Sequence, residues 1–254
     1  RIFSAPRSFP SAPVPVFIRA WYRLARGAIS KQLVAFGDAV MGPTRGALSA
    51  VSVLGCMFFA AISGSGAATT AAVGATLIPE LKERHYREDS AAALIASAGC
   101  IGVVIPPSVP MVLYAVIADQ SVTKLFQNGF VPGIMMGLVL IGISLKQAHD
   151  RNYPKGTPFS VTKAARTCVT ARWGILMPLI ILGGIFSGKF TPSEAAAVAV
   201  IYAAIVSFFI YRDLTVKELA RIILGSARTS AVIMIIIACS GIFGWVLANW
   251  RIPE

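Results

Sequence analysis

The stretch that decides the fold is Ala47–Pro79, which reads ALSAVSVLGCMFFAAISGSGAATTAAVGATLIP and carries no charged side chain over 33 residues. As one straight helix it would extend about 50 Å, well beyond the hydrocarbon layer of a bilayer, which is ~30 Å thick. In its middle lies Ile62–Gly66, ISGSG, a cluster of residues that favour turns. We therefore predict a re-entrant helical hairpin whose two arms dip to mid-membrane and return, with Ser63–Gly66 at the tip.

Further runs without charge follow along the chain, and each is long enough to cross a bilayer, which takes about 20 apolar residues and at least about 17. They are Ser90–Ala118 (29 residues), Leu125–Leu145 (21), Ala195–Tyr211 (17) and Ser230–Trp250 (21). Only 13% of the 254 residues are charged, against about 25% in soluble domains. A soluble protein would need a very large core to bury such runs. The sequence therefore predicts an all-α, polytopic transmembrane protein.

The net charge of +12 could suggest a nucleic-acid partner, but the basic residues lie in the joints between apolar runs. Lys and Arg are frequent in some joints: Arg1–Arg45 (seven), Glu80–Asp89 (three), Lys146–Arg172 (six) and Arg212–Thr229 (four). Asp119–Lys124 and Gly188–Glu194 carry one each. Cytoplasmic loops of membrane proteins are rich in Lys and Arg, so the expected partner is the lipid bilayer and no nucleic acid. This scheme requires both ends of the hairpin to face the cytoplasm.

The next apolar run, Ser90–Ala118, contains the adjacent prolines Pro106 and Pro107. Each proline removes a backbone donor and clashes with the preceding turn of a helix. We predict a helix that unwinds near Gly102–Ser108 and resumes toward Tyr114. Non-helical backbone at membrane depth is tolerated only inside protein or along a cavity. Two consecutive interrupted helices therefore predict a binding site, as in secondary transporters.

The two interrupted elements offer uncharged oxygen atoms, which suit a weakly held monovalent cation such as Na⁺. The candidate binding residues are Ser63, Gly64, Ser65, Gly66 and Thr69 (with Thr70 beside it) in the hairpin, and Gly102, Val103, Pro106, Pro107 and Ser108 in the broken helix. Sodium itself is placed at Ser63, Ser65 and Gly102. The alternative is that small residues here only allow helices to pack closely.

Enzyme chemistry is not indicated. The two histidines, His85 and His149, fall in predicted cytoplasmic joints, too far from Ser63 or Ser65 to act as a base in a membrane-embedded hydrolase. The apolar runs hold no cluster of metal ligands, the four cysteines form no CxxC pair, and no nucleotide-binding glycine loop occurs. We therefore predict a protein that is not an enzyme and that needs no cofactor beyond a coupling ion.

For the C-terminal part of the chain, the sequence predicts uninterrupted helices. Trp173–Ser187 is a short, glycine-rich crossing. In the following joint, Thr191 is placed as a helix N-cap with Glu194 completing a capping box. Asp213–Leu224 is interpreted as an interfacial amphipathic segment that ends at Gly225, and Ser230–Trp250 as the last crossing.

Four segments taken together resemble the large permease subunit of tripartite ATP-independent periplasmic (TRAP) transporters. They are FFAAISGSG at Phe58–Gly66, IPEL at Ile78–Leu81, IPPSVPM at Ile105–Met111 and GIFSGKFTPSEAAA at Gly184–Ala197. The resemblance implies an elevator-type carrier of bacterial inner membranes, built from two inverted repeats and driven by sodium. It also implies two partners: a small membrane subunit, and a periplasmic binding protein that delivers an organic acid such as a dicarboxylate, a sialic acid or a sugar acid.

On this resemblance the chain divides into three parts. Residues 46–150 form the transport region of the first repeat, with the hairpin at 47–79 and the broken helix at 90–118, and residues 151–254 begin an incomplete second repeat. Residues 1–45 form an atypical basic segment, interpreted either as a frameshift or as a surface-lying amphipathic helix, and the chain is expected to be truncated. The alternatives are a sodium/dicarboxylate-type carrier that needs no binding protein, and a nonfunctional fragment.

Overall fold

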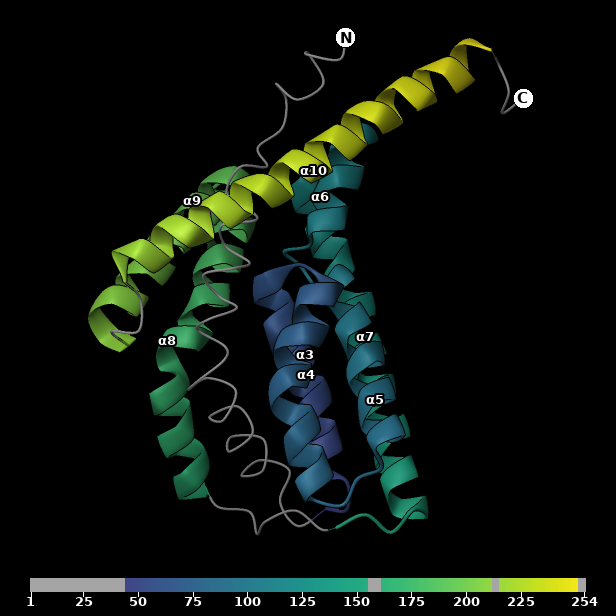
Figure 1. The fold of residues 1–254 in the computed structure, drawn as a ribbon, viewed down its shortest axis with the longest axis vertical. Helices are drawn as coiled ribbons and strands as arrows, with labels where there is room; N and C mark the ends of the chain where they lie inside the picture. Colours follow the sequence, from purple (N-terminus) through teal and green to yellow (C-terminus); the bar gives the residue numbers. More distant parts are fainter. Residues whose placement is uncertain (1–43, 155–160, 212–214, 251–254) are drawn as a thin grey trace.

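A computed structural model describes residues 44–154, 161–211 and 215–250. Residues 1–43, which make up nearly all of the expected basic segment 1–45, lie outside the described residues. Within these ranges all regular elements are helical and none is a β-strand, as the sequence predicts (Figure 1). The helices are α3 (Ala47–Ser63), α4 (Gly66–Glu83), α5 (Glu88–Cys100), the 3₁₀ turn η3 (Ile101–Val103), α6 (Val109–Ile117), α7 (Val122–Asp150), α8 (Val161–Phe186), α9 (Pro192–Ile205), the π-helical turn η4 (Val206–Tyr211) and α10 (Val216–Asn249).

Helices α3 and α4 form a helical hairpin joined by Gly64 and Ser65 alone. Gly64 has φ +61°, a left-handed conformation that ends α3 and that glycine adopts without a steric penalty. The Ser65 hydroxyl then accepts the N–H of Ala68 at 3.4 Å and caps α4. The helical hairpin expected around Ser63–Gly66 is therefore present. Its re-entrant position in a bilayer stays a prediction.

Helix α5 packs along both arms of the hairpin and ends where the prolines begin. After α5 the chain forms the 3₁₀ turn η3 and then runs without helix through Val104–Pro107. Helix α6 begins after Ser108, whose hydroxyl caps it by accepting the N–H of Met111 at 3.4 Å. The interruption predicted at Gly102–Ser108 is thus present. The paired prolines explain it, since neither can donate to a preceding carbonyl.

Helix α7 runs along this bundle and packs against α3 and the interrupted segment (Figure 1). Gly129, Gly133 and Gly137 lie four residues apart and form one face of α7, and these three are buried. Of the described residues, α7 is the one helix that is long and apolar enough, by length and composition, to cross a bilayer; Ala47–Ala61, Leu176–Phe186 and Ala197–Ile210 are shorter apolar stretches.

Helices α8 and α9 pack as a second pair. The predicted capping box is confirmed: the Thr191 hydroxyl accepts the N–H of Glu194 at 3.3 Å, and a Glu194 carboxylate oxygen accepts the N–H of Thr191 at 2.8 Å. Helix α8 starts at Val161, so it includes residues that the sequence analysis assigned to a joint.

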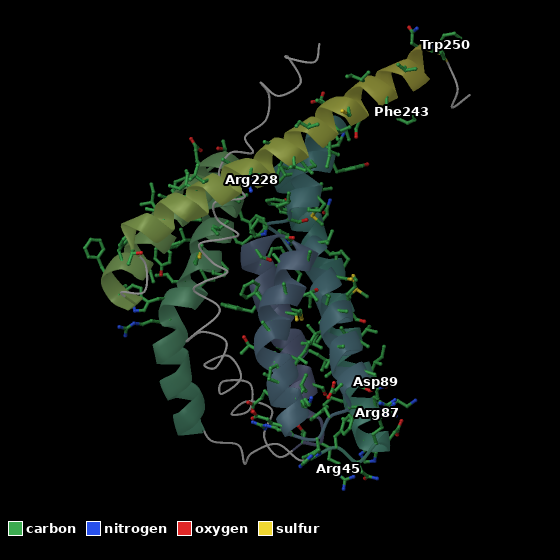
Figure 2. The ribbon with its side chains drawn as sticks, viewed as in Figure 1. Arg45, Arg87, Asp89, Arg228, Phe243 and Trp250 are labelled. Carbon is green, nitrogen blue, oxygen red and sulfur yellow. The ribbon has the colours of Figure 1, made fainter. Side chains whose placement is uncertain are left out.

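One prediction about the last helix is wrong. Gly225 does not end an amphipathic segment, because α10 continues through it for 34 residues, from Val216 to Asn249. A single glycine lowers helix stability by only about 1 kcal/mol, and no proline lies between Gly225 and Asn249 to stop the helix. In Figure 2, α10 lies obliquely to the bundle; the aromatic side chains of Phe243 within it and of Trp250 just after its end are exposed.

Candidate functional site

The tip of the hairpin lies directly against the broken helix. The carbonyl of Gly64 accepts the N–H of Val109 at 3.0 Å, which joins the turn between α3 and α4 to the start of α6. A Cβ atom added to Gly64 would lie 2.5 Å from the carbonyl oxygen of Pro107. On the other side of the turn, a Cβ at Gly66 would lie 3.1 Å from the carbonyl oxygen of Gly99. The two backbones approach this closely because both tip positions lack a side chain.

Beneath the tip, two hydroxyl groups are buried together. The oxygens of Ser63 and Thr69 are 2.7 Å apart, and the side chains are 3% and 0% exposed. The Ser63 hydroxyl also donates to the carbonyl of Ser65 at 3.3 Å. Buried hydroxyls are stable only when they find hydrogen-bond partners. Here they partner each other, so three oxygen atoms from different residues gather in one small volume.

Gly102 brings the broken helix to these oxygens. A Cβ atom at Gly102 would lie 2.8 Å from the Thr69 hydroxyl and 3.2 Å from the Ser65 carbonyl oxygen. Any larger residue would therefore fill the space that the oxygens face. The structure thus brings together Ser63, Ser65, Thr69 and Gly102, which the sequence analysis assigned to different elements.

The other candidates in the break have structural contacts. The Ser108 hydroxyl donates to the carbonyl of Val103 and accepts the N–H of Met111, which caps α6. Its donor and its acceptor are thus both used by nearby residues. Pro107 presents its carbonyl to Gly64, and Pro106, joined to it by a cis peptide bond, is buried. Val103 is 38% exposed and contacts the space beside Gly66 with its methyl group. These residues shape the site, while its hydroxyl oxygens come from the hairpin.

Four helix ends meet at this point. The C-terminal ends of α3 and η3 present carbonyl groups with partial negative charge, and the N-terminal ends of α4 and α6 present N–H groups with partial positive charge. No charged side chain occurs in Ser63–Thr70 or Gly99–Val109. In the part of the chain that the structure describes, no group of three or more His, Cys, Asp or Glu side chains gathers. The described residues at this point offer neutral oxygen ligands and helix dipoles.

The histidines lie far from these hydroxyls. His85 follows the last turn of α4, and 19 residues at 1.5 Å each place it about 28 Å from Gly66 at the other end of that helix. His149 lies in the last turn of α7. Neither can deprotonate Ser63 or Ser65, which a hydrolase would require.

Two packing features of the site were not found from the sequence. Gly99 lies so close to Thr70 that a Cβ would overlap the Thr70 hydroxyl. On α7, a Cβ at Gly129 would lie 2.9 Å from the carbonyl oxygen of Val104, and one at Gly133 would lie 2.7 Å from the side chain of Ile105. The four-residue spacing of the α7 glycines is the signal that could have shown this contact face, although not its partner.

Comparison with known proteins gives a consistent assignment. The family described as "Tripartite ATP-independent periplasmic transporter, DctM component" matches residues 1–254. The chain is 38% identical over 254 residues to a C4-dicarboxylate TRAP transporter large permease protein of Pseudomonas aeruginosa, covering 100% of the chain and 60% of the relative. It is 38% identical over 252 residues to an isethionate TRAP transporter permease protein of Oleidesulfovibrio alaskensis (99% and 40%). It is 31% identical over 245 residues to a sialic acid TRAP transporter permease protein of Haemophilus influenzae (96% and 40%). The chain spans about half the length of these relatives.

Proposed function

Because the chain belongs to the DctM-component family of tripartite ATP-independent periplasmic transporters, we propose that it forms part of a permease that takes up an organic acid with sodium. The permease is a multi-pass protein of the bacterial inner membrane. It works with a small membrane subunit and a periplasmic binding protein, in keeping with the word tripartite in the family's description. We propose that the chain acts as a transporter and not as an enzyme.

The observation that carries the proposal is the convergence of Ser63, Ser65, Thr69 and Gly102 on one buried volume. Sodium is a hard cation that prefers oxygen ligands. Neutral hydroxyl and carbonyl oxygens bind it without the strong attraction of a carboxylate, so that it can leave again. Two helix C-termini at the same point add partial negative charge.

The depth of this site agrees with a carrier. Helix α7 has 29 residues and extends about 43 Å, enough to cross the ~30 Å hydrocarbon layer. Its midpoint is Met136, and Gly133, which packs on Ile105 of the broken segment, lies about 4.5 Å from that midpoint along the axis. If α7 crosses the bilayer, the hairpin tip and the break lie near the midplane, where secondary transporters bind their ligands.

The proposed substrate is an organic anion. C4-dicarboxylate, isethionate and sialic acid, which the relatives' names give, all carry an acidic group. The N-terminal end of α4 lies beside the sodium ligands, and helix N-termini stabilise anions. A sodium ion and an acid group can therefore be held by opposite helix ends at one place.

The decisive experiment is sodium-dependent uptake in proteoliposomes that contain the complete permease with its small subunit and binding protein. Thr69→Val removes the buried hydroxyl at nearly constant volume, and we expect the sodium concentration for half-maximal uptake to rise about tenfold, as for the loss of one ligand. The matched control is Thr76→Val on the same helix, whose hydroxyl only bonds the carbonyl of Ala72. We expect this variant to behave as wild type.

Three outcomes would contradict the proposal. Uptake that does not depend on sodium would remove the coupling ion. Equal behaviour of Thr69→Val and Thr76→Val would show that the small residues at the tip serve packing alone. Uptake that proceeds at the same rate without the binding protein would favour instead a sodium/dicarboxylate-type carrier.

A further inference from the structure

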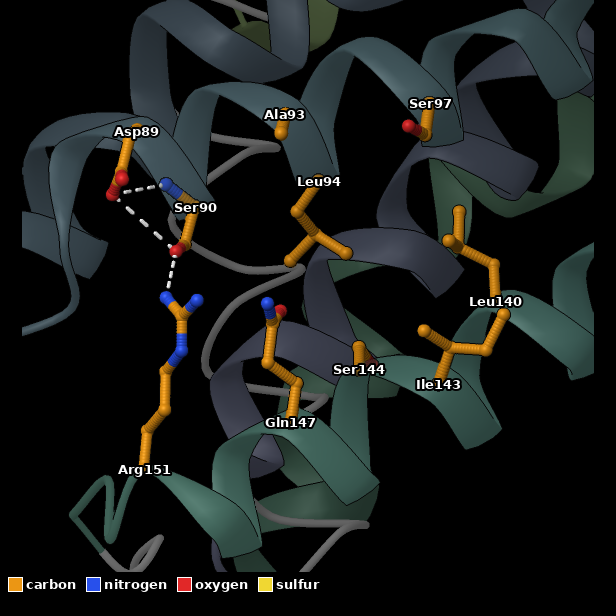
Figure 3. Close-up of a pocket in the computed structure, with 10 residues that line it drawn as sticks. All are labelled: Asp89, Ser90, Ala93, Leu94, Ser97, Leu140, Ile143, Ser144, Gln147 and Arg151. Carbon is orange, nitrogen blue, oxygen red and sulfur yellow. Dashed lines mark hydrogen bonds between the residues drawn. The ribbon is translucent and has the colours of Figure 1, made fainter.

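A groove with a volume of about 420 Å³ lies between α5 and α7, away from the hairpin tip (Figure 3). Along most of its length the walls are apolar or small side chains, Ala93, Leu94 and Ser97 from α5 and Leu140, Ile143 and Ser144 from α7. The Ser144 hydroxyl donates to the carbonyl of Ile141 in its own helix, so it does not call for a polar ligand.

One end of the groove is polar and carries a positive charge. Arg151 reaches across from the end of α7 and donates to the Ser90 hydroxyl, with Gln147 beside it (Figure 3). Asp89 also lines this end, but its carboxylate accepts two hydrogen bonds from Arg87, at 3.1 and 2.7 Å. The Arg87 guanidinium holds the pKa of Asp89 below its usual range, and the pair is neutral as a whole. Arg151 therefore sets the charge of this end.

A second guanidinium lies nearby. Arg45 donates to the side-chain oxygen of Asn152, the residue after Arg151. Among the described residues, neither Arg45 nor Arg151 forms an ion pair with a carboxylate. In Figure 2, Arg45, Arg87 and Asp89 lie at the same end of the bundle. By the distribution of Lys and Arg along the sequence, this end faces the cytoplasm.

The groove has the length and direction of one lipid tail. It follows α5 from Asp89 to Ser97, about 12 Å, and α7 from Leu140 to Arg151, about 16 Å. One leaflet of the hydrocarbon layer is about 15 Å thick. The groove runs along the helices, with its charged end at the expected membrane surface and its apolar part toward the interior.

We propose that this groove binds an anionic glycerophospholipid of the cytoplasmic leaflet. The phosphate binds Arg151 and the neighbouring amide group of Gln147. One acyl chain lies along Leu94, Leu140 and Ile143. A free phosphate would not need the apolar walls, and a zwitterionic lipid such as phosphatidylcholine would bring a quaternary ammonium group next to Arg151 together with its phosphate. Basic pockets between membrane helices on the cytoplasmic side are typical sites for anionic headgroups.

The inference rests on the membrane placement in the proposed function, but not on sodium coupling. Lipid binding is therefore measured without transport. The complete permease complex, delipidated in detergent, is titrated with dioleoyl phosphatidylglycerol or dioleoyl phosphatidylcholine, and bound lipid is counted by native mass spectrometry. We expect phosphatidylglycerol to bind more tightly, and Arg151→Gln to weaken it about fivefold.

Two further variants test the tail and the charge separately. Ala93→Phe, at an exposed position, fills the apolar part of the groove and should reduce phosphatidylglycerol binding strongly; Ser97→Phe tests the same part from one turn further along α5. Lys146→Gln is the matched control, because it removes the same charge from α7 at an exposed position outside the groove. It should change binding less than twofold.

The proposal is overturned if both lipids bind equally, or if Arg151→Gln and Lys146→Gln act alike. It is also overturned if Ala93→Phe and Ser97→Phe both bind phosphatidylglycerol as wild type while inorganic phosphate displaces it, since that result describes an anion site without a lipid tail. Loss of sodium-dependent uptake in a complex that still shows the expected lipid preference would refute the proposed function alone.

Discussion

Replacing Gly64 by alanine should show how tightly the hairpin tip is held against the broken helix. Two effects add. Gly64 has φ +61°, and a side chain in this conformation costs about 1–2 kcal/mol. The new Cβ would also lie 2.5 Å from the Pro107 carbonyl oxygen, which is backbone and cannot turn away. We expect the tip to withdraw and the hydrogen bond between Val109 N–H and the Gly64 carbonyl to be lost, at about 0.5–1.5 kcal/mol more.

Gly188 provides the matched control. It has φ +72° in the turn after α8, with no atom within 4 Å of an added Cβ. Gly188→Ala therefore carries the backbone cost of about 1–2 kcal/mol without the clash. Gly64→Ala should lower stability by about 1.5–3.5 kcal/mol in total, against about 1–2 kcal/mol for Gly188→Ala.

The assay is thermal unfolding of the complete permease in detergent, with and without sodium. A ligand that binds only the folded state raises Tm, so sodium should stabilise the wild type and the Gly188→Ala variant. Gly64→Ala should unfold at a lower temperature than Gly188→Ala and should lose most of the sodium-dependent rise. Equal Tm values and equal sodium shifts in the two variants would refute the contact between the tip and the break as described here.

Further predictions concern the support of the site and the helix ends. Gly129→Ala places a Cβ 2.9 Å from a backbone carbonyl of the break and should reduce uptake severalfold, whereas Gly142→Ala on the same helix meets nothing within 4 Å and should not. Ser108→Ala removes both a cap and a buried donor, so it should lower Tm more than Ser121→Ala, which removes an exposed cap alone. The backbone N–H and then the hydroxyl of its cap residue lower the pKa of Glu194. Its stabilising effect is therefore complete above the unfolded value of about 4.3 and is lost as pH falls through the lower folded value. Glu194→Gln should flatten that part of the curve of Tm against pH.

The features that the sequence predicted well are set by local chemistry. Adjacent prolines break a helix wherever they occur, so the interruption before Val109 could be placed within a few residues. The turn at Gly64 and Ser65 follows from a glycine that ends one helix and a serine that starts the next. The capping box of Thr191 and Glu194 has the same origin.

The features that it missed depend on tertiary neighbours. Thr69 and Thr70 are adjacent and chemically alike, yet the packing turns Thr69 toward Ser63 and Thr70 toward Gly99. The spacing of glycines along one helix cannot tell which element will fill the space beside them. Gly225 was taken as a helix end because a terminating glycine and a tolerated glycine look alike in sequence, and the backbone of α10 decides between them.

The glycine face of α7 constrains how the candidate site can move. Gly129 and Gly133 pack against the broken segment, and Gly137 packs against Met57 in the first arm of the hairpin. One helix thus contacts both halves of the site at distances that leave no room for a methyl group. A shift of either half past α7 would pull these contacts apart, whereas a displacement of α3 through α7 as one rigid block would keep them all. If the permease undergoes a large motion, we expect α3 through α7 to move together, so that the candidate site stays assembled.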